Sequence, residues 1–288
     1  MNKKTFFAFF KLLKVKILIS ALLSFSGAYL FANQYISNSK AFCFTFCGIA
    51  LSAAGAAALN HSQEKIVDAK MIRTQNRPIA NNELSQKTGY IFSFTLIIIG
   101  NIFLIIFSNI TTLVLSLLTV VTYNYIYTPL KQKSFINTYI GAIPGALPAL
   151  CGWTAANATL AQPQAWTLFF AIVLWQLPHF FAIDWLYRQQ YAVAGFEMLS
   201  KHFPSGAQNV IQSLIFSAIL IPYNYLFFYY KQLSMLYVII MTLISCIFFI
   251  TCINFSKNRS DTATRLSFRM SLLYLNGLFI CILCNYLI

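Results

Sequence analysis

Long apolar segments separated by short polar connections make up almost the whole chain. Each segment holds about 20 residues with few charges, which is the length that a helix needs to cross a bilayer. Nine such segments are found, at 15–33, 42–60, 88–107, 110–128, 137–156, 165–187, 208–230, 233–254 and 268–287. The pattern therefore predicts an all-α polytopic membrane protein with nine transmembrane helices, organised as a single domain over residues 1–288.

Composition and charge place the polar chemistry on one side of the membrane. Of the 288 residues, 59% are hydrophobic and only 9% are charged, which excludes an ordinary soluble globule. With nine helices of alternating direction, every Lys and Arg except Lys40 and Lys231 falls on the side of the N-terminus, together with all 6 acidic residues. Since basic residues concentrate in cytoplasmic loops, we expect a cytoplasmic N-terminus and a C-terminus on the outer side.

Three connections on the expected cytoplasmic side are longer than the others: 61–87, 129–136 and 188–207. We expect them to cover a site in a central cavity that opens to the cytoplasm. The net charge of +14 suits either attraction to anionic lipid or attraction of a polyanionic substrate. The short basic N-terminal segment lacks the long Arg- and Ser-rich stretch of a transit peptide, so a bacterial plasma (inner) membrane is expected.

A first polar motif lies where the second apolar segment ends. Asn60, Glu64 and Asp68 are spaced by four residues, so a helix would place their oxygens on one face. Mg²⁺ favours such oxygen ligands together with substrate phosphates, and we expect these three residues to be the metal ligands. Arg73 and Arg77 follow closely and are expected to bind phosphate oxygens and to stabilise a departing diphosphate.

A second motif lies at the end of the fourth segment. Tyr123, Tyr127 and Lys131 share a helical face by the same spacing, and Pro129 is expected to end the helix so that Lys131 reaches inward. Interfacial tyrosines beside a lysine whose charge reaches toward water would explain the same pattern without a binding function. The motif alone leaves these two interpretations open.

Prolines and ionisable residues mark the fifth and sixth segments. The run 141–148 contains two glycines and two prolines and is expected to interrupt its helix and line a cavity. In the sixth segment, His179 and Asp184 are ionisable groups inside an apolar stretch, where such groups are functional by default. Arg188, four residues after Asp184, could simply neutralise it. His179 suits a general base, a ligand or a hydrogen-bonded core residue.

These motifs together resemble the UbiA-type intramembrane prenyltransferases. The ending Arg73-Thr-x-x-Arg-Pro78, Tyr127-Thr-Pro-Leu-Lys131, Gly141-Ala-Ile-Pro-Gly-Ala-Leu-Pro148 and Trp175-Gln-Leu-Pro-His-Phe180 resemble, more narrowly, the protohaem IX farnesyltransferases. The resemblance runs from about residue 15 to the end of the chain. It implies a nine-helix fold with a central cavity, and transfer of a farnesyl group from farnesyl diphosphate to a vinyl group of haem B with addition of water.

The resemblance also implies roles for individual residues. His179, Arg73, Arg77 and Lys131 would be catalytic, with His179 handling the haem or a proton, and Mg²⁺ would be the cofactor. The implied partners are farnesyl diphosphate, haem B, membrane lipid and a downstream haem A synthase or terminal oxidase, with no nucleic acid. Residues expected to contact substrate are Tyr123, Tyr127, Asp184, Tyr187 and Arg188.

Two departures from the family pattern concern acidic residues. Glu64 stands where relatives of other substrate class more often have Asp, and Gln189-Gln190 stand where the family usually carries an acid. Asp184, one turn earlier, is a candidate replacement for that acid.

Two other functions fit part of the pattern. A prenyltransferase acting on a quinone precursor would share the first motif but should lack the pattern from Trp175 to Phe180. An anion transporter would also use interrupted helices and arginines, but it needs access from both faces, and the outer half here has almost no charge.

Overall fold

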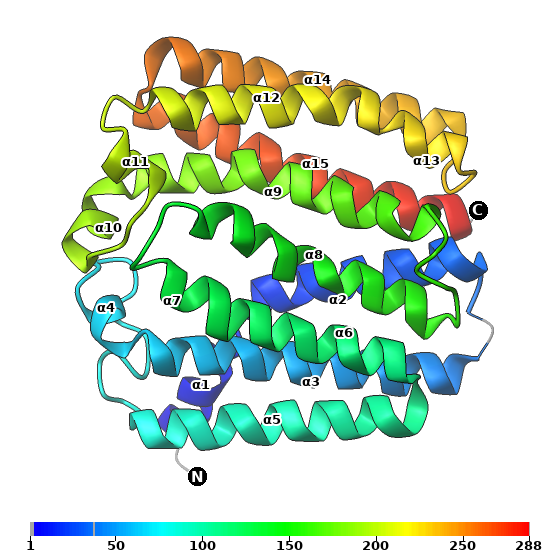
Figure 1. The fold of residues 1–288 in the computed structure, drawn as a ribbon, viewed down its shortest axis with the longest axis horizontal. Coiled ribbons are helices and arrows are strands. Elements are labelled where there is room, and N and C mark those ends of the chain that lie inside the picture. Colours follow the sequence, from blue (N-terminus) through cyan, green and yellow to red (C-terminus); the bar gives the residue numbers. More distant parts are fainter. Residues whose placement is uncertain (1–2, 37, 288) are drawn as a thin grey trace.

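The computed structural model describes residues 3–36 and 38–287, which form helices packed side by side (Figure 1). The long helices are α2 (Val15–Asn33), α3 (Ser39–Gln63), α5 (Gln86–Phe107), α6 (Ile110–Val121), α8 (Asn137–Ala155), α9 (Gln164–Leu186), α12 (Ala207–Tyr223), α14 (Met235–Asn258) and α15 (Asp261–Leu287). The short ones are α1 (Lys3–Leu12), α4 (Lys65–Ala69), the π-helix η1 (Thr122–Tyr127), α7 (Thr128–Leu130), α10 (Arg188–Ala194), α11 (Leu199–His202) and α13 (Tyr225–Tyr229). The described residues contain no strand, and the predicted all-α class is confirmed.

Eight helical stretches within the described residues are long and apolar enough to cross a membrane. Each corresponds to a predicted segment, with α6 continuing through η1 and α7, and α12 through α13. The remaining predicted segment forms α8, which is less apolar because it contains two prolines, three glycines and polar residues. Figure 1 shows α8 lying between α6 and α9, and most of its residues are buried, so the neighbouring helices rather than lipid surround it.

Helix α8 is continuous from Asn137 to Ala155, and the expected interruption at 141–148 does not occur. Pro144 and Pro148 lie inside the helix, where each removes one backbone hydrogen bond. Neighbouring helices can supply such lost contacts inside a membrane bundle. Gln176 of α9 binds the same stretch of α8, because its Nε2 donates to the carbonyl oxygen of Ala142 at 3.2 Å.

Pro129 does not end its helix either. The chain remains helical to Leu130, but the preceding turn widens into the π-helix η1, in which the backbone N–H of Thr128 reaches the carbonyl of Tyr123, five residues back. The Thr128 hydroxyl donates to the same carbonyl oxygen at 2.9 Å. A wider turn accommodates the proline ring, which would otherwise collide with the carbonyl one turn before it.

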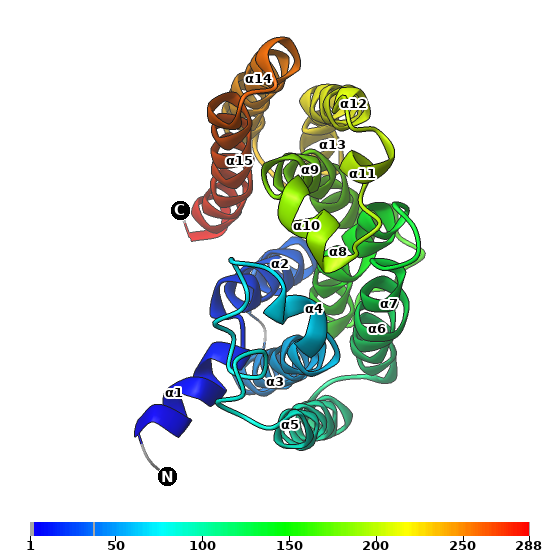
Figure 2. The same ribbon diagram turned by 90° about the vertical axis from the view of Figure 1, so that its left-hand side faces the viewer.

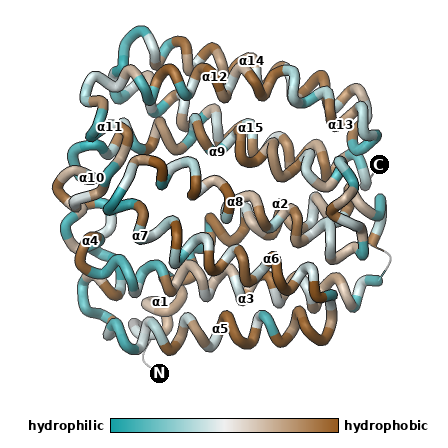
Figure 3. The backbone as a smooth tube through the Cα atoms, in the orientation of Figure 1, coloured by the Kyte–Doolittle hydropathy of each residue, from teal (hydrophilic) through white to brown (hydrophobic). Residues whose placement is uncertain are grey.

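The two ends of the bundle differ in polarity. Polar residues gather at the end that carries α4, α10 and α11, which is called the polar end below, and the helices between the two ends are mostly apolar (Figure 3). Seen from the polar end, α1 projects sideways from the bundle (Figure 2). The buried face of α1, with Ala8 and Leu12, packs against Ala58, Ile79 and Leu84.

Candidate functional site

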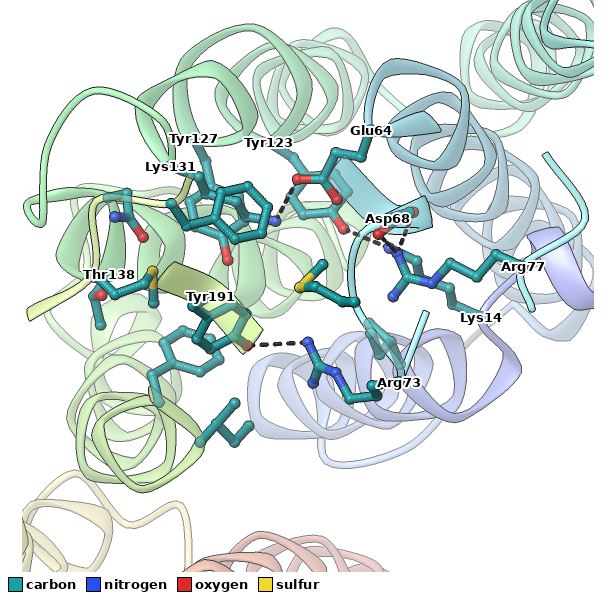
Figure 4. A pocket seen from close by; sticks show the side chains of 17 residues that line it. Lys14, Glu64, Asp68, Arg73, Arg77, Tyr123, Tyr127, Lys131, Thr138 and Tyr191 are labelled. Atoms are coloured by element: carbon teal, nitrogen blue, oxygen red, sulfur yellow. Dashed lines mark hydrogen bonds and ion pairs between the residues drawn. The ribbon is translucent and has the colours of Figure 1, made fainter. Parts of the chain in front are cut away.

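A cavity of about 220 Å³ opens at the polar end between α3, α8, α9 and the short helices (Figure 4). Its polar lining combines two carboxylates with four basic side chains, and hydrophobic residues complete the wall. The lining residues are Lys14, Ile17, Glu64, Asp68, Met71, Arg73, Arg77, Tyr123, Tyr127, Lys131, Asn137, Thr138, Phe180, Ile183, Tyr191, Phe196 and Met198.

The carboxylates of Glu64 and Asp68 reach the cavity because helical spacing persists across the junction of α3 and α4. The backbone N–H of Glu64 donates to the carbonyl of Asn60, and the N–H of Asp68 donates to that of Glu64. These i to i−4 hydrogen bonds keep both acids on one face, as the sequence predicts. Both side chains are buried apart from the cavity surface, with exposed fractions of 4% and 1%.

Each acid forms an ion pair with a basic side chain from another segment. The Asp68 carboxylate oxygens accept from Arg77 Nη1 at 2.7 and 2.8 Å, and Glu64 Oε1 accepts from Lys131 Nζ at 2.9 Å. Burial favours the neutral form of Glu64, but the neighbouring ammonium groups of Lys131 and Lys14 outweigh it and lower the pKa of Glu64. Burial also disfavours the charge of Lys131, yet Glu64 and the nearby tyrosines raise its pKa.

Asp68 shows the opposite balance. Burial raises the pKa of Asp68 above its usual value, although Arg77 lies beside it and favours the ionised form. The sequence motif thus provides two carboxylates of unequal acidity in one cavity, and a bound cation would favour ionisation of both.

Lys14 is a site residue that the sequence motifs did not indicate. It lies between α1 and α2 in a left-handed backbone conformation, with φ of +47°, and its side chain turns into the cavity. Its Nζ donates to Asn60 Oδ1 at 2.6 Å and to the Tyr123 hydroxyl at 3.3 Å. Burial, with the nearby charge of Arg77, lowers the pKa of Lys14 to about 7. In the sequence it is one of several N-terminal lysines.

Asn60 lies beside the carboxylates but does not line the cavity. Its side chain is fully buried, its Oδ1 accepts from Lys14, and its Nδ2 donates to the Thr128 hydroxyl at 2.9 Å. Asn60 therefore holds Lys14 and connects α3 to the start of α7.

Arg73 is held against α10 by three residues. Its backbone N–H donates to Gln190 Oε1 at 3.1 Å, and its Nη2 donates to the Tyr191 hydroxyl at 3.0 Å. The guanidinium carbon lies 4.5 Å from the centre of the Tyr187 ring, a cation–π distance. Tyr187 thus contacts Arg73 rather than the cavity directly, and Tyr191, which no motif identified, lines the cavity in its place.

His179 lies on a different side of α9 from the cavity. Its ring stacks between Trp175 and Phe268, with centroid distances of 5.0 and 4.9 Å, and its Nδ1 lies 2.8 Å from the Ser271 hydroxyl. The next residue, Phe180, lines the cavity. His179 therefore belongs to the contact between α9 and α15, next to the cavity wall.

Asp184 and Arg188 do not line the cavity. The Asp184 carboxylate is fully buried and accepts from the backbone N–H and hydroxyl of Ser200 and from Asn209 Nδ2, at 2.6 to 2.9 Å. Arg188 does not neutralise Asp184, since its Nη1 lies 3.4 Å from Asp261 at the start of α15. Asp184 anchors α11 and α12 to α9. It does not lie where it could replace the acid that the family usually carries near Gln190.

Glycines join the motifs that are far apart in the sequence. A Cβ at Gly141 would lie 2.5 Å from the ring of Tyr127, and one at Gly145 would lie 2.1 Å from Gln176 Oε1. A larger residue at either position would force Tyr127 or Gln176 to move. The three motifs around Tyr127, Gly145 and Gln176 therefore form one packed unit behind the cavity.

The cavity residues fit a divalent cation. Glu64 and Asp68 supply hard oxygen donors from one helical face, which is the number of carboxylates that Mg²⁺ commonly uses together with substrate phosphates and water. The other four of the 6 acidic residues in the chain are engaged elsewhere: Glu83 with Lys11, Asp184 with Ser200 and Asn209, Glu197 with Lys201 and His202, and Asp261 with Arg188. One acid pair thus serves the cavity.

Comparison with known proteins gives a consistent result. The model of the UbiA prenyltransferase family matches residues 18–275. A protoheme IX farnesyltransferase of Rhodopirellula baltica is 34% identical over 79% of this chain and 82% of its own length, and one of Salinibacter ruber is 33% identical over 82% and 83%.

Solved structures show the same fold at lower identity. A structure of digeranylgeranylglyceryl phosphate synthase superposes with a TM-score of 0.80 at 16% identity, covering 99% of both chains. A UbiA homolog from Archaeoglobus fulgidus bound to GPP and Mg²⁺ superposes with a TM-score of 0.69 at 13% identity, covering 96% of this chain and 99% of its own. The match of the family model over most of the sequence, together with this fold, shows that the chain belongs to the UbiA prenyltransferase family.

Proposed function

We propose that this protein transfers the farnesyl group of farnesyl diphosphate to a vinyl group of haem B, with addition of water, giving haem O and diphosphate. The observation that carries the proposal is the cavity at the polar end, in which two carboxylates and four basic side chains meet an apolar wall. Relatives named protoheme IX farnesyltransferase support haem as the acceptor, and the homolog bound to GPP and Mg²⁺ supports a prenyl diphosphate as the donor.

The basic side chains of the cavity would bind the diphosphate and stabilise it as it leaves. Arg77 and Lys131 reach the cavity from opposite sides of the carboxylates. Lys14 and Arg73 have no ion pair with a carboxylate among the described residues, and a bound diphosphate would favour the charged form of Lys14. Preorganised charges of this kind favour the transition state because little reorganisation is needed when the C–O bond breaks. A Mg²⁺ ion held by Glu64 and Asp68, with Asn60 beside them, would supply Lewis acidity at the diphosphate oxygens.

The hydrophobic wall would protect the allylic carbocation that remains after diphosphate departure. Phe180, Phe196 and the rings of Tyr127 and Tyr191 line the cavity, and aromatic faces stabilise positive charge. Exclusion of bulk water gives the haem vinyl group time to attack the farnesyl C1 atom. The new C–C bond transfers the positive charge to the vinyl carbon next to the porphyrin, and addition of water there completes the reaction.

His179 would position the acceptor rather than the diphosphate. It sits between two aromatic rings on the α15 side of α9, one residue before the cavity-lining Phe180. We expect His179→Ala to lose haem modification while diphosphate binding is retained. Weaker binding of both substrates would instead show a structural role in the packing of α9 against α15.

The test is a reconstituted reaction. The purified protein is incubated with haem B, farnesyl diphosphate and Mg²⁺, and the products are examined by mass spectrometry for a hydroxyfarnesylated haem. A parallel incubation replaces haem with an aromatic quinone precursor. A prenylated quinone precursor without haem product would overturn the proposal in favour of a sister activity of the same family.

The proposed cellular location rests on the distribution of charged residues between the two ends of the bundle. We place the polar end at the cytoplasmic face of a bacterial plasma membrane, because the basic residues gather there. Haem O would then be released for a haem A synthase or a terminal oxidase in the same membrane.

A further inference from the structure

Helix α1 differs from the long helices in direction. The long helices run along the bundle, whereas α1 lies across them near the polar end and points away from the bundle (Figure 1 and Figure 2). Its 10 residues span about 15 Å, which is too short to cross the hydrocarbon layer of a bilayer. In a chain whose long helices cross the membrane, a short helix in this orientation lies along the membrane surface.

The neighbours of α1 place it where the hydrocarbon layer begins. Ile19 in the second turn of α2 and Ile91 in the second turn of α5 are exposed, as expected of side chains on membrane-spanning helices that face lipid tails. Helix α1 leads into α2 through Lys14, and its Phe9 ring lies 4.8 Å from the ring of Phe92 in α5. It therefore lies beside the first turns of both helices, at the boundary between headgroups and tails.

Two faces of α1 are apolar, and the protein covers one of them. Ala8 and Leu12 are buried in the cluster with the end of α3 and the following loop. On the other face, the side chains of Phe6, Phe7 and Phe10 are 55%, 60% and 50% exposed, because helical spacing gathers them on one side. An exposed apolar face of this kind marks contact with a membrane or with another protein.

Charge favours an anionic lipid surface as the partner of this face. Five lysines lie within the first 16 residues, and the first acidic residue of the chain is Glu64. Lys11 and Lys16, on either side of the junction of α1 and α2, are both exposed; Lys11 lies 3.9 Å from Glu83, and Lys16 has no ion pair in the described part of the chain. Phenylalanines on one face with lysines beside them are typical of helices that lie on anionic membranes, since the rings enter the tail region and the ammonium groups bind phosphates.

The junction that follows α1 carries the cavity residue Lys14. With its φ of +47°, the chain turns there from the direction of α1 into that of α2, and its Nζ reaches Asn60. A left-handed conformation is costly for a residue with a side chain and persists only when the surrounding structure holds it. The bundle holds α2, whereas α1 is held mainly by the small cluster on one of its faces. Lipid on the other face would hold the second side of the junction.

We propose that α1 docks on anionic phospholipids of the leaflet at the polar end, with its three exposed phenylalanines among the acyl chains and with Lys11 and Lys16 at the phosphates. Docking holds the turn at Lys14 and thereby keeps its ammonium group in the cavity, a consequence that rests on the proposed function. The lysines of the N-terminal region thus divide between two anions, the membrane surface and the diphosphate.

Docking is measured without enzymatic activity. The purified full-length protein is placed in vesicles of phosphatidylcholine alone or of equal parts of phosphatidylcholine and phosphatidylglycerol, and amide hydrogen exchange of residues 5–12 is followed by mass spectrometry. We expect exchange to be about 10-fold slower in the anionic vesicles, because a helix of this length is marginal alone and contact with lipid stabilises it. The triple variant Phe6→Ser, Phe7→Ser and Phe10→Ser should lose this difference, and the matched triple change to Leu should keep it.

The link to Lys14 is measured by kinetics in the same vesicles. We expect the KM for farnesyl diphosphate to be about 5-fold higher in neutral than in anionic vesicles, the opposite of the trend that repulsion of the substrate by anionic lipid would give. The triple Phe→Ser variant should show the higher KM in both. Lys11→Gln combined with Lys16→Gln should reduce the dependence on anionic lipid, and Lys40→Gln, the same change at the other end of the bundle, should leave it as in the wild type.

The outcomes separate docking from the proposed function. Equal exchange of α1 in the two kinds of vesicle would overturn docking on anionic lipid. Slow exchange that persists in the triple Phe→Ser variant would also overturn it, since packing against the protein would then hold the helix. Exchange that depends on lipid beside a KM that does not would overturn the link to Lys14. Absence of any haem product from the wild type would remove the proposed function and that link, while the exchange measurement would still decide the docking.

Discussion

The polar ends of α3 and α9 look alike in sequence and serve different purposes in the structure. Both carry ionisable residues spaced by about one helical turn at the end of an apolar segment. At α3, Glu64 and Asp68 face a cavity and meet basic residues from other segments. At α9, Asp184 faces α11 and α12 and is surrounded by donors from the protein itself. Spacing therefore predicts a shared face, whereas the function depends on what that face meets.

The largest effect should follow from a change at the α3 end. We expect Asp68→Asn to reduce Mg²⁺-dependent turnover by at least about 100-fold, because the metal loses one of two carboxylate ligands and Arg77 loses its partner. Turnover and the thermal unfolding midpoint are measured together. Unchanged turnover in a folded variant would exclude Asp68 as a ligand.

Metal stoichiometry sharpens the same comparison. Since only one acid pair lines the cavity, we expect one Mn²⁺ to bind per chain in the presence of a non-reactive farnesyl thiodiphosphate. Loss of the free Mn²⁺ signal in electron paramagnetic resonance counts the bound ions. Two bound ions, falling to one in Asp184→Asn, would show that the α9 end also binds metal. Glu83→Gln, an acid outside the cavity, is the matched control.

An intermediate effect is expected for Lys131, which connects the two sides of the cavity through its ion pair with Glu64. Lys131→Gln should lower kcat by about 10- to 100-fold, because one preorganised positive charge is lost near the leaving group. Lys131→Arg should recover part of the activity. If Lys131→Gln changed only the KM for farnesyl diphosphate, the side chain would contribute to substrate binding and not to stabilisation of the transition state.

At the α9 end, a substitution of Asp184 should lower the free energy of unfolding more than it lowers turnover. Asp184→Ala leaves the Ser200 and Asn209 donors buried without an acceptor, and we expect a loss of about 3 kcal/mol. Turnover per folded molecule should change less than about 3-fold. Thermal unfolding in detergent and activity at low temperature separate the two quantities. A large loss of turnover at unchanged stability would place Asp184 in the site after all.

The smallest effect is expected for Arg188, which the family resemblance implied as a substrate contact. Its ion pair with Asp261 is partly exposed, and exposed pairs contribute little. Arg188→Gln should therefore change the KM values for both substrates by less than about 2-fold. A selective rise in the KM for haem would mean that Arg188 turns toward the acceptor during the reaction.

Hydropathy was sufficient to locate the long helices, and helical spacing was sufficient to place Glu64 and Asp68 on one face. The contact of Lys131 with Glu64 spans 67 residues and depends on tertiary packing. The sequence could not show that Lys14 joins them, because a contact across 46 residues to Asn60 depends on how α2 packs beside α3. The sequence also could not identify Thr138 as a cavity-lining residue, because its position there depends on how α8 packs against its neighbours. Proline was also a poor guide: α8 remains helical through Pro144 because tertiary packing outweighs the loss of one backbone hydrogen bond.

The π-helical turn at η1 has a consequence for how this chain can vary. A π turn is equivalent to one extra residue inserted into an α-helix, so the residues before and after it differ in helical phase by about 100°. Tyr123 belongs to this turn and Lys131 follows it, yet both line the cavity. Regular α winding of the same number of residues would rotate Lys131 away from Glu64, whereas deleting one residue between 122 and 127 would restore regular winding with Lys131 still facing Glu64. This segment can therefore lose one residue and keep the orientation of the side chains that follow it.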